Sequence, residues 1–111
     1  MKYGLPENAV DQINGVLAQF PEVTRAVLYG SRAKGNHKPG SDIDLTLFGE
    51  ISWKLCASIA DALDELLLPY TIDLSVFALL NHPELEAHIE RVGLVFYEKS
   101  ALSITARQTD I

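Results

Sequence analysis

In residues 42–48 (Asp-Ile-Asp-Leu-Thr-Leu-Phe), polar and apolar side chains alternate from Asp42 to Leu47. Successive side chains of a β-strand point to opposite faces, so this pattern predicts a strand with one face in a core. The apolar row consists of Ile43, Leu45 and Leu47. Asp42 and Asp44 then share the opposite face, where two like charges repel each other. Because that repulsion is costly in a purely structural strand, the pattern favours a strand that presents two carboxylates to a cation.

Two Gly-Ser pairs flank a short basic loop in front of this strand. Gly30 and Ser31 follow the apolar run 23–29, which is typical of a strand that enters a turn. Gly40 and Ser41 lead directly into the acidic strand. Backbone N–H groups in such a turn can cradle phosphate oxygens, and hard divalent cations prefer carboxylate and phosphate oxygens as ligands. The segment predicts chemistry on a nucleoside triphosphate; the alternative is a β-hairpin with a polar loop and two solvated aspartates.

A third aspartate has the same setting. Residues 70–76 form another strand candidate, with an apolar row of Ile72, Leu74 and Val76 and with Asp73 on the other face. If this strand lies beside residues 42–48, Asp73 completes a cluster of three carboxylates, because adjacent strands are roughly 4.8 Å apart. Without the upstream motif, an exposed strand residue is the simpler interpretation of Asp73.

These motifs resemble the nucleotidyltransferases of the DNA polymerase β superfamily. The pattern of that family is a Gly-Ser turn, a Gly-Ser-Asp-x-Asp strand and an aspartate on a later strand, and all three aspartates are present here. The resemblance covers nearly the whole chain, from the first helix to the closing strand at 93–97. The short length resembles the minimal nucleotidyltransferase (MNT) class in particular, whose members are antitoxin partners of HEPN-domain ribonuclease toxins.

The resemblance implies a mechanism and a partner. Asp42 and Asp44 would hold two Mg²⁺ ions, and Asp73 would bind the metal at the attacking hydroxyl and accept its proton. ATP would be the substrate, with its phosphates held by Gly30, Ser31, Arg32, Gly40 and Ser41. The implied product is AMP on a tyrosine of a HEPN toxin, so the chain would act as the antitoxin.

Two other functions stay open. The chain can transfer a nucleotide to a small molecule such as an antibiotic, with a helical partner subunit that completes the site. It can also be a non-catalytic binding module that neutralises a toxin sterically, although the complete set of three aspartates argues against this. A homo-oligomer and a hetero-oligomer are both compatible with the sequence.

Charge and composition indicate which ligands and which cellular compartment suit this chain. The 111 residues carry a net charge of −6, which is unsuited to gripping free nucleic acid through its phosphates. Three of the nine basic residues, Arg32, Lys34 and Lys38, nevertheless lie in the loop between the Gly-Ser pairs, where they suit a triphosphate. No apolar run approaches a membrane span, and residues 1–6 have no signal-peptide h-region. The single Cys56 agrees with a reducing compartment, so we expect a cytoplasmic protein.

Periodicity predicts the order helix, strand, short helix, strand, helix, strand, helix, strand. The predicted long helices span 6–19, 52–67 and 83–91, and the predicted strands span 23–29, 42–48, 70–76 and 94–97. This order predicts an α/β (α+β) domain with one mixed β-sheet, helices packed on one face and the acidic site on the other. The nucleotidyltransferase fold itself is implied by the resemblance. We expect residues 1–99 to form the domain and residues 100–111 to form a mobile polar tail.

The three histidines are interpreted without a catalytic role. His37 is expected to face solvent in the basic loop, His82 to act locally at a helix start, and His88 to lie on the surface of the last helix.

Overall fold

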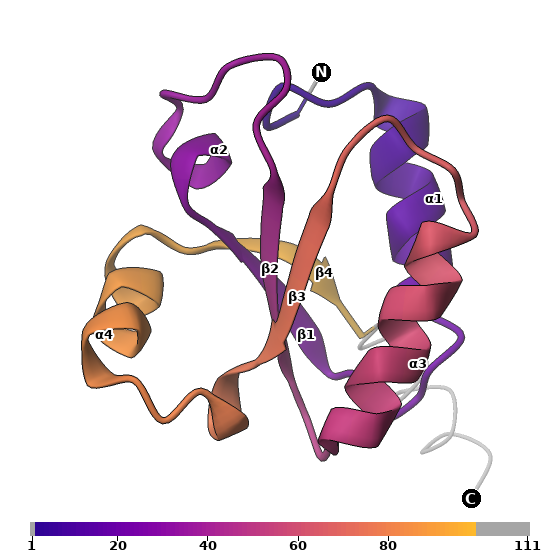
Figure 1. The fold of residues 1–111 in the computed structure, drawn as a ribbon, viewed down its shortest axis with the longest axis vertical. Helices are drawn as coiled ribbons and strands as arrows, with labels where there is room; N and C mark the ends of the chain where they lie inside the picture. The colour runs from indigo at the N-terminus through magenta and orange to yellow at the C-terminus, as the bar shows by residue number, and fades with distance from the viewer. Residues whose placement is uncertain (1, 100–111) are drawn as a thin grey trace, which may run out of the picture.

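Four strands form one mixed sheet in the computed structural model, which describes residues 2–99 (Figure 1). The strands are β1 (Arg25–Tyr29), β2 (Ile43–Phe48), β3 (Ile72–Val76) and β4 (Leu94–Glu98), and their order across the sheet is β3-β2-β1-β4. β1 runs antiparallel to both β2 and β4, whereas β2 and β3 are parallel. Parallel neighbours require a crossover connection, and the helix between β2 and β3 provides it.

The predicted order of elements is confirmed. The helices are α1 (Glu7–Leu17), α2 (Ser31–Lys34), α3 (Trp53–Asp64) and α4 (Pro83–Val92), and a 3₁₀ turn, η1 (Phe77–Leu79), was not predicted. The Ser52 side chain accepts a hydrogen bond from the Leu55 N–H at 3.0 Å and so caps the N-terminus of α3. The helix ends at Asp64, three residues before the predicted end.

The main core lies between the sheet and the pair α1 and α3, which cover the same face in Figure 1. The apolar row of β2 is fully buried there, as its alternation predicts: Ile43, Leu45 and Leu47 have no exposed surface. Ile13 and Leu17 of α1 and Ile59 and Leu63 of α3 meet this row. The acidic face of β2 therefore points away from α1 and α3.

One helix lies on the other face, where none was predicted. α4 packs across β1 through Ile89, which forms a second, smaller apolar cluster with Val27 and Tyr29. The mixed-sheet fold class is confirmed, but the expectation that helices cover only one face is wrong. The physical reason is that β1 is apolar on both faces, so the side turned away from the main core also needs cover.

None of the helices within residues 2–99 is long and apolar enough to cross a membrane. The prediction of a mobile tail at 100–111 concerns residues outside the described range.

Candidate functional site

Strand register brings the predicted carboxylates together. Asp44 of β2 is paired with Asp73 of the parallel strand β3, and on its other side it is paired with Tyr29 of β1. Directly paired residues of neighbouring strands share a face, so these three side chains form one row across the sheet, on the face away from α1 and α3. Asp42 lies one residue before β2 and shares this face by alternation. The predicted neighbourhood of Asp44 and Asp73 is confirmed.

The Gly-Ser turn lies against this row. Gly30 has a φ of +76°, in the region that favours glycine, and a Cβ there would overlap Oδ2 of Asp44. Ser31 is the first residue of α2. The backbone of the predicted phosphate cradle is therefore in direct contact with a predicted metal ligand, as chemistry on a triphosphate requires.

The row concentrates negative charge. Burial raises the pKa of Asp44 above its usual value of 3.8, and the charges of Asp73 and then Asp42 raise it further. His88 has a smaller, opposing effect on the same pKa. A carboxylate whose ionised form is disfavoured by its neighbours is stabilised by an added cation, so the electrostatics of the row favour cation binding.

The carboxylates of the row have the chemistry that a divalent cation requires of its ligands. Carboxylate oxygens are the ligands that Mg²⁺ prefers, and the mutual repulsion described above is the charge imbalance that such an ion relieves. Within residues 2–99, however, no three His, Cys, Asp or Glu side chains converge closely enough to form a ready-made metal site. Assignment of Asp42, Asp44 and Asp73 as metal ligands thus stays a prediction.

The Arg32 side chain is buried and holds the loop in position, so it does not belong to an exposed basic patch. Its side chain is 2% exposed. Its guanidinium donates to the carbonyl oxygens of Tyr3 (2.8 Å), Ser41 (2.9 and 3.1 Å) and Pro39 (3.3 Å). The same group lies 5.3 Å from the ring centroid of Tyr70. The planar fork ties the loop to the N-terminal segment, because carbonyl oxygens of both accept hydrogen bonds from it. Binding of phosphate by Arg32 stays a prediction.

The second Gly-Ser pair shapes the same loop. The Ser41 Oγ accepts a hydrogen bond from the Lys38 N–H at 2.8 Å, which closes the turn before β2. Gly40 is exposed and has open space around its Cα. Lys34 and Lys38 are exposed, so of the three basic loop residues these two remain accessible to an anionic ligand.

Two residues near the row were not assigned a role from the sequence. The rings of Tyr29 and His88 meet edge to face, with centroids 6.4 Å apart and an interplanar angle of 83°. His88 is half-buried and its ring faces Tyr29 from α4, a contact that the interpretation of His88 as a surface residue did not include. The other histidines act locally: His82 Nδ1 caps α4 by accepting from the Leu85 N–H, and His37 packs against Gly4. The sequence contained one indication of this contact: β1 is apolar on both faces, so a second element has to cover the face that carries Tyr29.

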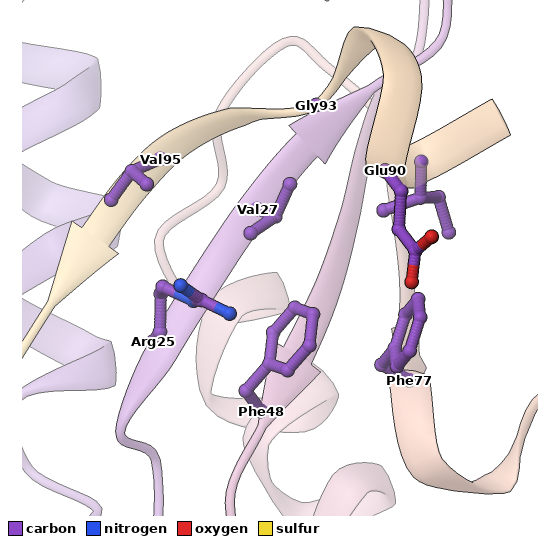
Figure 2. Close-up of a pocket in the computed structure, with 8 residues that line it drawn as sticks. Arg25, Val27, Phe48, Phe77, Glu90, Gly93 and Val95 are labelled. Carbon is purple, nitrogen blue, oxygen red and sulfur yellow. The ribbon is translucent and has the colours of Figure 1, made fainter. Parts of the chain in front are cut away.

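A cavity of about 240 Å³ lies further along the same face of the sheet, beneath α4 (Figure 2). Its floor is aromatic: the rings of Phe48 and Phe77 stack with centroids 4.7 Å apart, and the Arg25 guanidinium lies 4.4 Å from the Phe48 centroid. Val27, Ile89, Glu90, Gly93 and Val95 complete the lining. Phe48 is four residues beyond Asp44, or about 13 Å along the strand, so this cavity is separate from the acidic row.

Comparisons with known proteins were made for sequence and for structure. The family described as "Polymerase beta, Nucleotidyltransferase" matches residues 11–102. No curated protein sequence matches the chain. A crystal structure of a toxin–antitoxin with AMP-PNP is 18% identical, with a TM-score of 0.64 over 95% of this chain and 89% of that one.

Two further solved structures are similar. A tri-AMPylated Shewanella oneidensis HEPN toxin in complex with its MNT antitoxin gives 17% identity and a TM-score of 0.62, over 84% of this chain and 72% of that one. The toxin–antitoxin MntA-HepT gives 16% identity and a TM-score of 0.62, over 85% and 74%. At these identities the likeness establishes a shared fold.

Proposed function

The chain belongs to the polymerase β nucleotidyltransferase family, and on that premise we propose that it transfers AMP from ATP to a tyrosine hydroxyl of a HEPN-type toxin. In this role it is the antitoxin of the pair, and it acts in the cytoplasm. The observation that carries the proposal is the direct contact of the Gly30 backbone with Asp44, whose strand partner is Asp73. Phosphate-binding backbone and acidic groups are thereby in one place.

Each part of the site has a task in this reaction. The turn at Gly30 and Ser31 binds the β- and γ-phosphates through backbone N–H groups and the serine hydroxyl. Asp42, Asp44 and Asp73 would hold two Mg²⁺ ions, and the ions would supply positive charge at the transferred phosphate and at the leaving pyrophosphate. Lys34 and Lys38 are exposed in the loop and attract the triphosphate.

The proposed transfer forms one bond, breaks one bond and moves one proton. The acceptor oxygen forms a bond to the α-phosphorus, the bond from that phosphorus to the bridging oxygen breaks, and pyrophosphate leaves. Asp73 accepts the proton of the attacking hydroxyl. Asp73 is exposed on β3 at the edge of the sheet, a position that a large acceptor can reach.

Two observations support a protein acceptor. Solved structures with the same fold include an MNT antitoxin bound to a HEPN toxin that carries three AMP groups. The net charge of −6 disfavours free nucleic acid as the acceptor.

The proposal is tested by intact-mass spectrometry of a HEPN-type protein that is co-expressed with this chain. After incubation with the chain, ATP and Mg²⁺, its mass should rise by one or more AMP units, and chelation of the metal should abolish the rise. Asp73→Asn should abolish it as well, whereas Asp61→Asn on the exposed side of α3 should not. Neutralisation of the toxin by the Asp73→Asn chain without any AMP transfer would favour the binding module instead. Transfer to an antibiotic but not to the toxin would favour the small-molecule enzyme.

A further inference from the structure

The sheet face that carries the acidic row also carries the cavity beside α4. Arg25 of β1 is paired with Phe48 of β2, and four residues further along each strand Tyr29 is paired with Asp44. Alternation places both pairs on the same face. α4 packs over this face at Val27 and Tyr29, whereas Arg25 and Phe48 line the cavity (Figure 2). The cavity therefore opens onto the face on which the proposed reaction takes place.

Apolar side chains line the cavity and continue onto its rim. The rings of Phe48 and Phe77 are stacked within it, with centroids 4.7 Å apart. Val95 of β4 is 50% exposed at the rim, and its neighbour Leu94 is also exposed. β4 is an edge strand, and such strands are commonly protected by charged side chains or proline against contact with other chains. Exposed apolar residues here, beside a cavity, are typical of a surface that a partner covers.

The Arg25 guanidinium supplies positive charge at the cavity. It lies 4.4 Å from the centroid of Phe48, and in Figure 2 its side chain points toward that ring. Glu98 is its partner in the strand register and Glu90 also lines the cavity, but neither forms an ion pair with it, nor does any other carboxylate within residues 2–99. A guanidinium binds a carboxylate through two parallel hydrogen bonds, which are stronger where apolar groups exclude water. The cavity is thus complementary to an apolar group that has a carboxylate beside it.

Size and charge favour another protein as the source of that group. The cavity of about 240 Å³ is smaller than the roughly 300–1,000 Å³ of typical small-ligand pockets. Aromatic residues and arginine, which form its floor, are enriched at the centres of protein interfaces. A second copy of the chain is a poorer partner, because each copy carries a net charge of −6 and the copies repel each other.

We propose that this cavity docks the acceptor protein of the transfer reaction, which inserts an apolar side chain against Phe48 and Phe77 and places a carboxylate on Arg25. The inference rests on the proposed function for the identity of that protein, a HEPN-type toxin. Phe48 lies about 13 Å along β2 from Asp44, a distance that roughly four residues of extended chain can span. An acceptor docked here therefore approaches the acidic row from the same face of the sheet.

The test measures how tightly the full-length chain binds a co-expressed HEPN-type protein. Calorimetry is carried out without nucleotide or metal, so that docking is separated from the reaction. Arg25→Gln removes the charge at the cavity, and Val95→Glu places a carboxylate on its apolar rim. We expect each variant to raise the Kd about 10- to 100-fold, because a few central contacts carry most of the binding energy of an interface. The KM for the HEPN-type protein in AMP transfer should rise by a similar factor.

Two matched control variants lie on the other side of the sheet. Lys54→Gln removes a charge from the exposed surface of α3, and Leu67→Glu adds a carboxylate at a side chain that is 88% exposed just after α3. Because α3 covers the opposite face, neither variant should change the Kd. Amide hydrogen exchange in the unaltered complex needs no variant, and binding should slow exchange in residues 77–79 and 94–98. This measurement decides the question should Arg25→Gln or Val95→Glu not fold.

The outcomes separate this inference from the proposed function. Weaker binding by Arg25→Gln and Val95→Glu supports the docking site even if the HEPN-type protein gains no AMP, a result that contradicts the proposed reaction alone. Transfer of AMP with unchanged Kd in both variants overturns the docking site and leaves the reaction standing. Slower exchange confined to α1 and α3 overturns it as well. A chain that is dimeric alone in analytical ultracentrifugation, and monomeric as Val95→Glu, would assign the rim to a second copy and overturn the inference.

Discussion

Gly30 and Asp44 are in such close contact that a Cβ atom at position 30 would overlap the Oδ2 of the carboxylate. The contact joins the turn after β1 to the strand that carries two of the three acidic residues. A side chain at position 30 would have to push the carboxylate out of the row. Turn and carboxylates therefore behave as one unit, and a change in either alters the other.

Gly30→Ala should damage both stability and ligand binding. The φ of +76° and ψ of −155° at Gly30 are essentially restricted to glycine, so alanine should lower the free energy of unfolding by about 1–3 kcal/mol. Displacement of Asp44 should add a loss of Mn²⁺–ATP affinity, which calorimetry measures. Gly35→Ala is the matched control, because Gly35 also has a positive φ but no atom would contact its Cβ. Equal ATP affinities for the two variants, measured under conditions where both are folded, would contradict the contact.

Asp44→Asn should stabilise the metal-free chain at neutral pH. Because the folded-state pKa of Asp44 is raised above 3.8, the folded state binds a proton more readily than the unfolded state does. Stability is therefore lost as the pH rises from 3.8 through the folded-state pKa, and the penalty is complete above that pKa. Asparagine removes this penalty, so the difference in melting temperature should favour the variant at pH 7, shrink as the pH falls through the folded-state pKa, and be absent below 3.8.

The control for this pH series is Asp61→Asn on the exposed surface of α3, which should show no such trend. A metal-free Asp44→Asn chain that melts below the unaltered chain at pH 7 would mean that the carboxylate is stabilised by its surroundings.

Arg32→Lys should destabilise the fold although the charge is kept. A lysine cannot reproduce the planar fork that reaches the carbonyl oxygens of Tyr3, Pro39 and Ser41, and carbonyls left without a partner are costly. We expect the free energy of unfolding in urea to fall by about 3 kcal/mol. Lys34→Ala, at an exposed position, should change it by less than about 0.5 kcal/mol. Unchanged stability together with weaker ATP binding in Arg32→Lys would restore the role in phosphate binding that the sequence predicted.

Cys56 should be unreactive while the chain is folded. Its side chain is 4% exposed, and burial raises the pKa of its thiol above the usual 9.0, which lowers the fraction of reactive thiolate. Reaction with an aromatic disulfide reagent at pH 8 should be slow in buffer and fast in concentrated urea. Equal rates in the two solvents would place the thiol at the surface.

Local patterns were enough to predict the elements and the faces of the acidic strand. Ile43, Leu45 and Leu47 are buried as their alternation indicates, and Ser52 caps the helix that it precedes. These features depend on side-chain alternation and on hydrogen bonds between residues three apart, so the neighbouring sequence contains the information. The fold class and the family were accessible for the same reason, since the Gly-Ser and Asp-x-Asp spacings are local.

The sequence by itself determined which carboxylates and which Gly-Ser turn are candidates for binding a metal and a phosphate, but only the tertiary structure decided how they meet. Pairing of β2 with β3, which brings Asp73 beside Asp44, depends on the crossover through α3 and on burial of both apolar rows. The position of α4 over β1 brings His88 to Tyr29, and that position follows from the need to cover Val27, far away along the chain. The structural role of Arg32 could not be predicted, because the carbonyl oxygens that satisfy its buried guanidinium come from the loop and from the N-terminal segment, and no local pattern records that convergence.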